Sequence, residues 1–375
     1  MKYFLVAGEA SGDLHASNLM REIQKLDSQA SFRFFGGDLM EAVGGSLLKH
    51  YREMAFMGVI AVVMNSRTIL ANMALCKKEI QDWKPDVLIL VDYASFNLKI
   101  AKFAKENLPD MPVHFYISPK IWAWKEFRIK AFKKYIDKMY VILPFESAFF
   151  AKHDFPVSYV GNPSVDSVAA FHSQPFDEAA FRSKYGLDER LVLAVLPGSR
   201  KGEITRNLPL MLEVAAEYRQ FQVVVAGSPG LDRSFYEPFM PEGTKLIFGE
   251  TYPILEIAYT AIVTSGTATL ETGLFSTPQV VCFAVSGGSL PNWVFRHFMH
   301  VPYISLVNLI VNKMVVPELM GALFTKVHLI AALEPLLSDS PERKAMLQGY
   351  AEVQSRLGEP GASARTASLL VDSIK

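Results

Sequence analysis

The sequence predicts an α/β protein in which two doubly wound domains follow each other along the chain. Short apolar runs alternate throughout with longer segments of helical periodicity. Several runs are apolar at consecutive positions, as expected for parallel strands that are buried on both faces. Nearly every run ends in Gly, Pro, Ser or Asp before a helical segment begins, which is the strand–helix–strand repeat of doubly wound sheets.

The predicted strands form two series. The first contains Tyr3–Ala7, Phe32–Phe35, Val87–Val91, Val113–Ile117, Met139–Leu143 and Ser158–Val160. The second contains Leu191–Leu196, Gln222–Ala226, Lys245–Phe248, Ala261–Thr264 and Gln279–Phe283. A polar stretch from about residue 162 to 189 separates the two series, so we expect domains over residues 1–165 and 166–344. A C-terminal helix over residues 345–375 is a candidate to complete the first domain.

The composition is that of a well-packed globular enzyme. Of 375 residues, 50% are apolar and 20% are charged, which excludes a disordered chain. Lys+Arg and Asp+Glu both number 38, so no global field attracts nucleic acid. The eight histidines are scattered, and Cys76 and Cys282 lack a C-x-x-C spacing. We therefore expect no metal site and no disulfide framework. The G-x-S-x-G elbow of a hydrolase triad is also absent from the sequence.

The sequence predicts a cytoplasmic chain that is soluble or lies on a membrane surface. The N-terminal apolar run, Phe4–Ala7, is four residues long, and Glu9 and Asp13 follow at once. We therefore expect a first strand there and no signal peptide. The longest nearly uninterrupted apolar stretch, Met54–Met64, is about half of what a membrane span requires.

A glycine-rich turn, Gly8-Glu9-Ala10-Ser11-Gly12-Asp13, joins the first strand to the first helix. Its glycines allow a tight turn and close approach of a ligand to the backbone, and the helix N-terminus favours negative charge. The G-x-G-x-x-G spacing of a dinucleotide site is missing, which disfavours a nicotinamide dehydrogenase. An ordinary turn with Asp13 near the helix start explains the same residues equally well.

Asp92 follows the buried strand Val87–Val91 directly. Open α/β sheets bind ligands at the carboxyl ends of their strands, so this carboxylate is a candidate functional group. Its spacing alone leaves three roles open: a general base, a ligand to a sugar hydroxyl, or a residue that forms the turn.

Two turns in the second half are suited to a diphosphate. Leu196-Pro197-Gly198-Ser199-Arg200 ends the most apolar strand, and an Arg at this place can bind phosphate oxygens bidentately. Thr264–Leu270 places small and hydroxylated residues at a helix start, where backbone N–H groups can bind an anion. Glu271 follows about one turn later and could accept hydrogen bonds from a ribose diol. A surface arginine and an ordinary capped helix are the alternatives.

Two features suggest a lipid partner. The segment Met54–Met64, continued by Ile69, Leu70, Met73 and Leu75, is apolar and rich in methionine, which adapts to irregular apolar ligands. A basic cluster contains Lys125, Arg128, Lys130, Lys133, Lys134 and Lys138. Phe127, Ala131, Tyr135 and Met139 recur every four residues, which predicts an amphipathic helix beneath these charges. A core-facing helix with a solvated basic face is the alternative.

Together these motifs resemble the bacterial lipid-A-disaccharide synthase family. They occur in the family's order from residue 1 to about 320: Gly8–Asp13, Met57-Gly58, Asp92 with Phe96-Asn97, Tyr116–Pro119 with Trp122-Ala123-Trp124, Leu143–Glu146, Val160–Pro163, Leu196–Arg200, Ser265–Glu271, and Ile304–Leu306 with Asn308. The Ser-Pro-x-x-Trp-Ala-Trp block is particularly specific, because chance would rarely assemble it. The resemblance implies a GT-B fold, in which two Rossmann-like domains face each other across a cleft.

The resemblance also implies a reaction and its partners. The family transfers 2,3-diacylglucosamine from UDP to 2,3-diacylglucosamine 1-phosphate (lipid X), with inversion at the anomeric carbon and without a metal or cofactor. This is a step of lipid A and lipopolysaccharide synthesis in Gram-negative bacteria. The expected partners are the two substrates and the anionic cytoplasmic face of the inner membrane, which the enzyme would touch peripherally. A homodimer is left open.

Residue roles follow from the same resemblance. In the second domain Arg200 and the helix start after Ser265 would bind the diphosphate, with Glu271 near the ribose. In the first, Asp92 would take the proton from the attacking 6-hydroxyl, while Trp122 and Trp124 would lie near the acyl chains. Further residues expected at the substrates are Gly8, Glu9, Ser11, Gly12, Asn97, Ser118, Gly198, Ser199, Gly266, Thr267, Thr269 and Asn308.

The chain departs from the family pattern at several positions. The residues concerned are Ala61, the Tyr93-Ala94-Ser95 run after Asp92, Asn162 and Gly321. The main alternative is another sugar-nucleotide enzyme of the same fold, such as a UDP-GlcNAc epimerase or a muropeptide-type transferase. A non-catalytic two-domain binding protein is a further alternative, although such proteins are normally exported.

Overall fold

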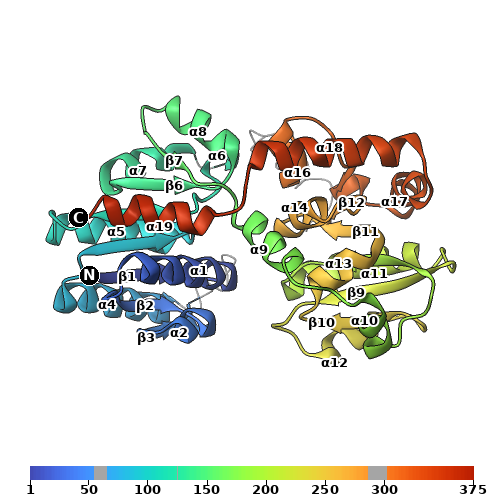
Figure 1. Ribbon diagram of the computed structural model, residues 1–375, viewed down its shortest axis with the longest axis horizontal. Coiled ribbons are helices and arrows are strands. Elements are labelled where there is room, and N and C mark those ends of the chain that lie inside the picture. The colour runs from blue at the N-terminus through green and yellow to red at the C-terminus, as the bar shows by residue number, and fades with distance from the viewer. Residues whose placement is uncertain (55–65, 125, 286–301) are drawn as a thin grey trace. The chain divides into compact units, whose positions relative to one another are not determined.

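The computed structural model describes residues 1–54, 66–124, 126–285 and 302–375, which separate into two compact units (Figure 1). The first unit comprises Met1–Asp166 together with Glu359–Lys375, and the second comprises Ser167–Gly358. The chain therefore passes between the units twice. Each unit contains one sheet, and all strand pairs among the described residues are parallel.

The first unit contains a seven-stranded sheet in the order β3-β2-β1-β4-β5-β6-β7. Its elements are β1 (Lys2–Ala7), α1 (Ala10–Leu26), β2 (Ser31–Gly36), α2 (Asp38–Val43), β3 (Ser46–His50), η1 (Tyr51–Glu53), α4 (Ser66–Trp83), β4 (Val87–Val91), α5 (Ala94–Asn107), β5 (Val113–Tyr116), α6 (Ile121–Trp124), η2 (Glu126–Arg128), α7 (Ile129–Tyr135), β6 (Lys138–Val141), α8 (Pro144–Ala151), β7 (Ser158–Tyr159), α9 (Pro163–His172, which continues into the second unit) and α19 (Ala362–Asp372).

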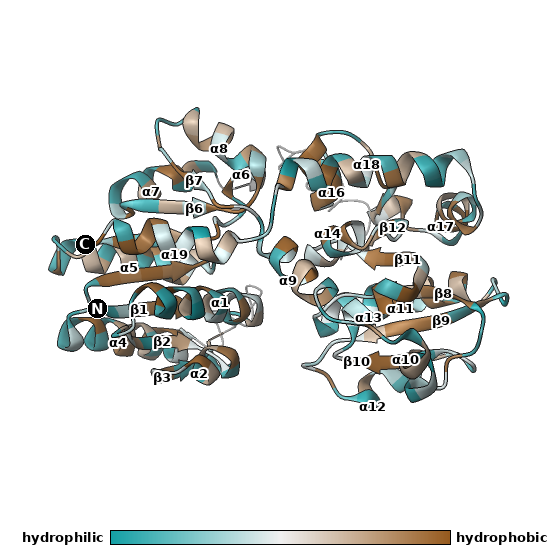
Figure 2. Cartoon of the chain, in the orientation of Figure 1, coloured by the Kyte–Doolittle hydropathy of each residue, from teal (hydrophilic) through white to brown (hydrophobic). Residues whose placement is uncertain are grey.

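Helices cover both faces of this sheet, and alternate residues of each strand enter two separate cores. Phe4 and Val6 of β1 pack with residues of α4, α5, α7 and α8, whereas Tyr3, Leu5 and Ala7 pack with α1, α2 and α19. The strands must therefore be apolar at consecutive positions. Figure 2 shows hydrophobic residues along strands of this sheet.

The second unit contains a six-stranded sheet in the order β10-β9-β8-β11-β12-β13. Its elements are α10 (Glu178–Tyr185), β8 (Leu191–Leu196), α11 (Lys201–Ala215), β9 (Phe221–Gly227), α12 (Arg233–Tyr236), η3 (Glu237–Phe239), β10 (Lys245–Phe248), α13 (Thr251–Ile257), β11 (Ala258–Thr264), α14 (Thr267–Leu274), β12 (Gln279–Phe283), α16 (Leu306–Val311), β13 (Glu318–Met320), η4 (Gly321–Leu323), α17 (Lys326–Leu333), η5 (Glu334–Leu337) and α18 (Pro341–Leu357).

Both sheets have the strand order of a doubly wound fold. In each, the first strand of the unit lies beside the second strand on one side and beside the fourth on the other. The chain reverses its direction of progress at this point, between β1 and β4 and again between β8 and β11. Ligands of open α/β sheets bind outside the carboxyl ends of strands at such a switch point. The predicted α/β class with two doubly wound sheets is confirmed.

All eleven predicted strands are present, but two further edge strands, β3 and β13, were not predicted. The segment over residues 345–375 is helical as predicted but is not one helix, because Gly358 (φ 76°), Pro360 and Gly361 (φ 111°) break it into α18 and α19. α18 belongs to the second unit and α19 to the first. Asp166 accepts hydrogen bonds from the backbone N–H groups of Gly361, Ala362 and Ser363, and so caps α19 at its start.

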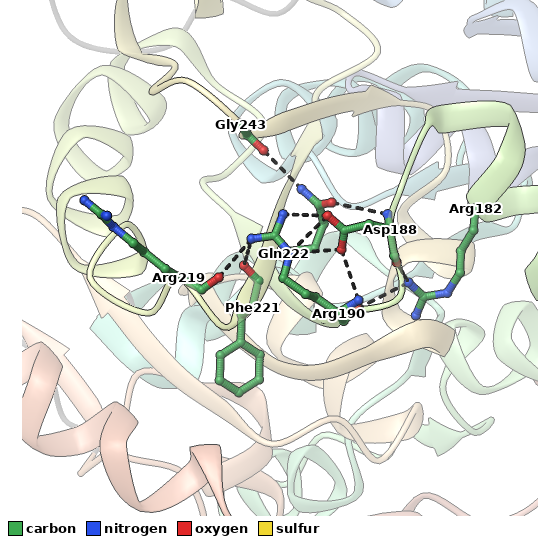
Figure 3. A network of polar contacts seen from close by, with 7 residues as sticks. All are labelled: Arg182, Asp188, Arg190, Arg219, Phe221, Gln222 and Gly243. Atoms are coloured by element: carbon green, nitrogen blue, oxygen red, sulfur yellow. Dashed lines mark hydrogen bonds and ion pairs between the residues drawn. The ribbon is translucent and has the colours of Figure 1, made fainter.

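The amino edge of the second sheet is joined by a polar network (Figure 3). Arg190 donates to both carboxylate oxygens of Asp188, at 2.6–3.0 Å, and to the carbonyl oxygens of Arg219 and Phe221. Gln222 donates to the carbonyl oxygen of Gly243 at 3.0 Å. These contacts link the entries to β8 and β9 with the turn before β10.

Candidate functional site

The predicted site residues gather at the switch points of the two sheets. In the first unit, Gly8–Asp13 follows β1 and Asp92 follows the neighbouring strand β4. In the second, Leu196–Arg200 leaves β8 and Ser265–Glu271 follows the neighbouring strand β11. Each pair of turns thus lies at the edge where doubly wound sheets bind ligands.

The backbone at this edge of the first unit is strained. Asp92, Tyr93 and Ile117 have φ values of 44°, 46° and 66°, in the left-handed region that residues with a side chain rarely adopt. Asp92 and Ile117 follow the paired strands β4 and β5, and the Asp92 N–H donates to the Tyr116 carbonyl oxygen at 3.1 Å. Such strain persists only where the surroundings hold it, and it is concentrated at functional sites in proteins.

Asn97 holds the Asp92 turn in place. Its side chain is fully buried, and Nδ2 donates to the carbonyl oxygens of Val6, Val91 and Asp92 at 3.4, 3.2 and 2.8 Å. This amide therefore ties the ends of β1 and β4 together. Its contacts are those of a residue that shapes the site, whereas the sequence predicted a contact with substrate.

The Tyr93 ring leaves room for no residue larger than glycine at position 8. A Cβ atom at this position would lie 2.3 Å from the ring of Tyr93, so the ring occupies the space that the sequence assigned to a ligand. The Tyr93 hydroxyl donates to the Met54 carbonyl oxygen at 2.7 Å. Burial raises the pKa of Tyr93, and the negative charge of Glu9 raises it further. Glu9 therefore lies near Tyr93, at the start of α1.

Asp13 has a structural role that the sequence did not reveal. Its carboxylate is buried and accepts hydrogen bonds from the backbone N–H groups of Gly37, Leu39 and Met40 at 2.8–3.1 Å. It thereby caps α2, not its own helix. Gly12 lies close to Ala7 at the end of β1, and Ser11 is exposed.

The segment after β5 is anchored by a buried acid. Trp122 is buried and donates from Nε1 to Oε1 of Glu146 at 3.1 Å, and its ring packs edge-on against Phe145. Ser118 is also buried and donates to the Pro119 carbonyl oxygen. Burial raises the pKa of Glu146 to about 7, while its hydrogen bonds act in the opposite direction. Trp124 ends α6, and its side chain lies outside the described residues.

In the second unit Arg200 is the N-cap residue of α11. Its side chain is 53% exposed and lies 3.2 Å from Oε1 of Glu203. The preceding Gly198 has φ 108° and little room for a Cβ atom beside Glu203. The Ser199 carbonyl oxygen accepts a hydrogen bond from Ser228. This turn presents a cation at the start of a helix, an arrangement that attracts anions.

The start of α14 offers backbone donors more than hydroxyl donors. Ser265 donates its hydroxyl to the Ile304 carbonyl oxygen and Thr269 donates to that of Gly266. Each hydroxyl has one proton, so both are already used within the protein. Thr267 is exposed at the first position of the helix, and Gly266 has open space around its Cα. The first N–H groups of a helix lack partners within it, although the Thr269 N–H already donates to the Gly266 carbonyl oxygen at 3.2 Å.

Glu271 lies one turn into α14 and is paired with Tyr252. The tyrosine hydroxyl donates to Oε1 of Glu271 at 2.9 Å. Burial raises the pKa of this carboxyl, and the hydrogen bond from Tyr252 partly offsets the rise. A carboxylate has a second oxygen that can accept a further hydrogen bond. Sequence analysis missed Tyr252, which lies 19 residues away on another helix.

Asn308 is saturated within its own unit. Its Nδ2 donates to the Val316 carbonyl oxygen and to Glu318, and its Oδ1 accepts from the N–H groups of Val315 and Val316. These four bonds use the full capacity of an asparagine amide. Glu318 in turn accepts from the backbone N–H groups of Ile304 and Ser305. Asn308 therefore joins α16 to residues 315–318, which follow it, and its predicted contact with substrate stays a prediction.

The amphipathic helix predicted beneath the basic cluster is partly wrong. α7 ends at Tyr135, and Met139 lies on strand β6. Ile129 and Phe132 are the buried residues of α7, whereas Phe127 is 73% exposed. Lys130, Lys133, Lys134 and Lys138 are exposed. Lys125 and most of the methionine-rich segment, including Met57 and Ala61, lie outside the described residues.

Three of the departures from the family pattern occupy structural positions. Ser95 accepts a hydrogen bond from Arg128 at 3.0 Å. Asn162 donates to the Ile142 carbonyl oxygen and accepts from the Ser164 N–H. Gly321 has φ 57°, a conformation that glycine adopts without strain.

Two general features of the described residues bear on chemistry and location. No three His, Cys, Asp or Glu side chains among them are grouped so as to hold a metal ion. Within the same part of the chain, none of the helices combines the length and apolar character needed to cross a bilayer.

Comparison with known proteins places this geometry in a family. The family described as lipid-A-disaccharide synthetase matches residues 3–369. The lipid-A-disaccharide synthase of Syntrophus aciditrophicus is 38% identical over 380 residues, which cover 99% of this chain and 97% of that protein. The chain belongs to the lipid-A-disaccharide synthase family. The Myxococcus xanthus member of this family is also 38% identical, over 100% of this chain and 97% of its own length.

Solved structures resemble the fold of this synthase family member at low sequence identity. A UDP-GlcNAc 2-epimerase from Neisseria meningitidis bound to UDP-GlcNAc has a TM-score of 0.68 at 12% identity, covering 100% of this chain and 99% of that one. The glycosyltransferase of kitacinnamycin has a TM-score of 0.64 at 13% identity, over 100% and 99% of the two chains. The fold is therefore of the GT-B class, which glycosyltransferases share with these epimerases.

Proposed function

We propose that this glycosyltransferase joins UDP-2,3-diacylglucosamine and 2,3-diacylglucosamine 1-phosphate into lipid A disaccharide 1-phosphate, releasing UDP. The observation that carries the proposal is full-length similarity to lipid-A-disaccharide synthases, combined with the position of the family's motifs at the switch point of each sheet. Asp92 lies at this edge of the first sheet. Arg200 and the start of α14 lie at the corresponding edge of the second sheet.

The second unit would bind the UDP-sugar. Arg200 and the N–H groups at the start of α14 supply positive charge for a diphosphate, and Glu271 supplies an acceptor for the ribose diol. Preorganised donors of this kind stabilise a departing UDP, so the reaction would need no metal. Gly198 and Gly266 would let the diphosphate approach the backbone, and Thr267 would add a hydroxyl.

The first unit would bind the acyl-sugar acceptor. Asp92, at the end of β4, would take the proton from the attacking hydroxyl, which inversion at the anomeric carbon requires. Glu9 lies at the neighbouring turn and is the alternative base. Asn97 and the strained residues around Asp92 would keep the carboxylate aimed at the acceptor. The acyl chains would lie near α6 and the methionine-rich segment.

Contact with an anionic membrane surface would come from α7. Lys130, Lys133 and Lys134 are exposed on this helix, and Phe127 is exposed just before it. Basic side chains beside an exposed aromatic ring suit the headgroup region of a bilayer. The enzyme would then act on the cytoplasmic face of the inner membrane, where its lipid substrates reside.

The test is to incubate the purified chain with UDP-diacylglucosamine and lipid X and to follow UDP and the disaccharide phosphate by mass spectrometry. Formation of the disaccharide by the wild type, but not by Asp92→Asn, is the expected result. A parallel incubation with UDP-GlcNAc alone examines the epimerase alternative. Conversion there without any disaccharide would overturn the proposal in favour of epimerisation.

A further inference from the structure

Glu146 is an acid that the structure buries almost completely. It lies at the third position of α8, and only 1% of its surface is exposed. Charged side chains are rarely buried to this extent unless partners satisfy them. Oε2 accepts hydrogen bonds from the backbone N–H groups of Leu143 at 2.9 Å and Ile142 at 3.2 Å. This part of the arrangement resembles the glutamate of a capping box.

The other carboxylate oxygen reaches a different segment of the chain. Oε1 accepts a hydrogen bond from the indole Nε1 of Trp122, 24 residues earlier. The neighbouring Phe145 also packs against Trp122, with ring centroids 4.9 Å apart and an interplanar angle of 88°. The start of α8 therefore holds the indole through one polar and one aromatic contact. A helix cap alone would need neither.

The anchored segment begins at the strained end of β5. Ile117 has φ 66°, which is especially unfavourable for a β-branched residue. Ser118 follows, is buried, and donates its hydroxyl to the Pro119 carbonyl oxygen at 3.0 Å. The N–H group of Ile117 donates to Tyr140, while that of Asp92 donates to Tyr116. The Asp92 turn and the 117–122 segment therefore share one edge of the sheet, and Glu146 holds the far end of the segment.

We propose that Glu146 is a positioning residue, which fixes Trp122 and residues 117–122 so that this edge keeps the shape that the acyl-sugar acceptor needs. The proposal rests on the function proposed above for the first unit. A carboxylate suits the role because three N–H donors converge on it, and both of its oxygens accept. A glutamine has one acceptor oxygen and would turn an NH₂ group toward backbone donors.

The first experiment compares Glu146→Gln, Trp122→Phe and the double variant. Trp122→Phe retains an aromatic ring and removes the N–H donor. The KM for lipid X should rise about ten- to a hundredfold in each, as expected for loss of a hydrogen bond to a charged group. The double variant should be no worse than the more affected single variant. UDP affinity, measured by calorimetry, should stay unchanged, and Glu106→Gln on the exposed face of α5 is the matched control.

The second measurement does not depend on the reaction. Hydrogen exchange at the amides of Ile142, Leu143 and residues 117, 118 and 120–122 should become at least about tenfold faster in Glu146→Gln, with β8 unaffected. Unchanged exchange, or an unchanged KM in an active enzyme, would overturn the positioning role. A parallel loss of UDP affinity would overturn it too, because the damage would then be global. If the wild type makes no disaccharide while exchange still accelerates, the proposed function fails and the anchoring by Glu146 stands.

Discussion

Two arginines of the second unit lie at opposite edges of the same sheet and differ in what they join. Arg190, at the amino edge, links Asp188 to the carbonyl oxygens of Arg219 and Phe221 (Figure 3). Arg200, at the carboxyl edge, lies beside Glu203 on the first turn of its own helix. The two side chains are similarly exposed, at 43% and 53%, so burial does not distinguish them.

The partners of these two arginines, more than their exposure, indicate whether each charge has a structural or a functional role. An arginine that joins separate segments contributes to folding, whereas Arg200, at the start of α11, is proposed to bind the diphosphate. Substitution of a charge that is proposed to contact the ligand should therefore change turnover, and substitution of a charge that joins separate segments should change stability. The predictions for Asp92, Arg200, Arg190 and Asp13 below test this comparison.

The largest effect is expected for Asp92→Asn in the first unit. The substitution keeps the size of the side chain but removes its basicity, and a positioned base typically contributes about 10²–10⁴-fold to the rate. Turnover should fall by about that factor, while the melting temperature and UDP affinity remain unchanged. Steady-state kinetics with both substrates and a thermal melt provide the measurement.

Glu9→Gln is the matched control, since Glu9 lies at the neighbouring turn and near Tyr93. A larger loss in Glu9→Gln than in Asp92→Asn would move the general base to Glu9. Retention of more than about a tenth of the activity in Asp92→Asn would reduce Asp92 to a positioning residue.

Arg200→Ala should give the next largest effect. Removal of one preorganised donor from an anionic leaving group typically costs about 2.7–4 kcal/mol of barrier. Activity should therefore fall about a hundred- to a thousandfold while the protein stays folded. Arg190→Ala should behave in the opposite way, with a loss of about 1–3 kcal/mol in the free energy of unfolding and normal turnover of the folded protein. Equal effects of the two substitutions on turnover would contradict the distinction between these two arginines.

Replacement of Lys130, Lys133 and Lys134 by Gln concerns charges that lie at neither edge. Each lysine near an anionic bilayer contributes about 1 kcal/mol, so binding to anionic vesicles should weaken substantially. High salt should weaken the wild type in the same way, because screening shortens to about 3 Å at 1 M. Vesicle sedimentation measures both. If neither the substitutions nor high salt releases the protein from the vesicles, the methionine-rich segment becomes the better candidate for attachment.

The smallest effect is expected for Asp13→Ala, at the carboxyl edge of the first sheet. Asp13 caps α2, so its loss should lower the free energy of unfolding by about 0.5–2 kcal/mol. Turnover of the folded protein should stay normal. Asp38→Ala, at an exposed acid of the same region, is the control and should change stability little. A turnover loss specific to Asp13→Ala would place this acid among the functional groups.

The fold could be predicted because buried parallel strands leave long apolar runs in the sequence. The two missed strands lack this signal, since β3 is half-exposed and β13 has three residues. The positions of Asp92 and Arg200 at strand ends could be read in the same way. The roles of Asp13, Glu146 and Asn308 could not, because their partners lie elsewhere in the chain and only folding brings them together. A four-residue apolar repeat likewise predicted one helix across Met139, which tertiary pairing made a strand.

The first unit is built from two stretches of the chain that are far apart in the sequence. This has a consequence for how the protein folds during synthesis. Leu19, Met20 and Ile23 of α1 share a core with Ala367, Leu370 and Val371 of α19. The second unit is translated between them, which takes roughly ten to forty seconds at typical elongation rates. During this interval the apolar face beneath α19 has no cover. The nascent first unit therefore exposes this apolar face until α19 leaves the exit tunnel.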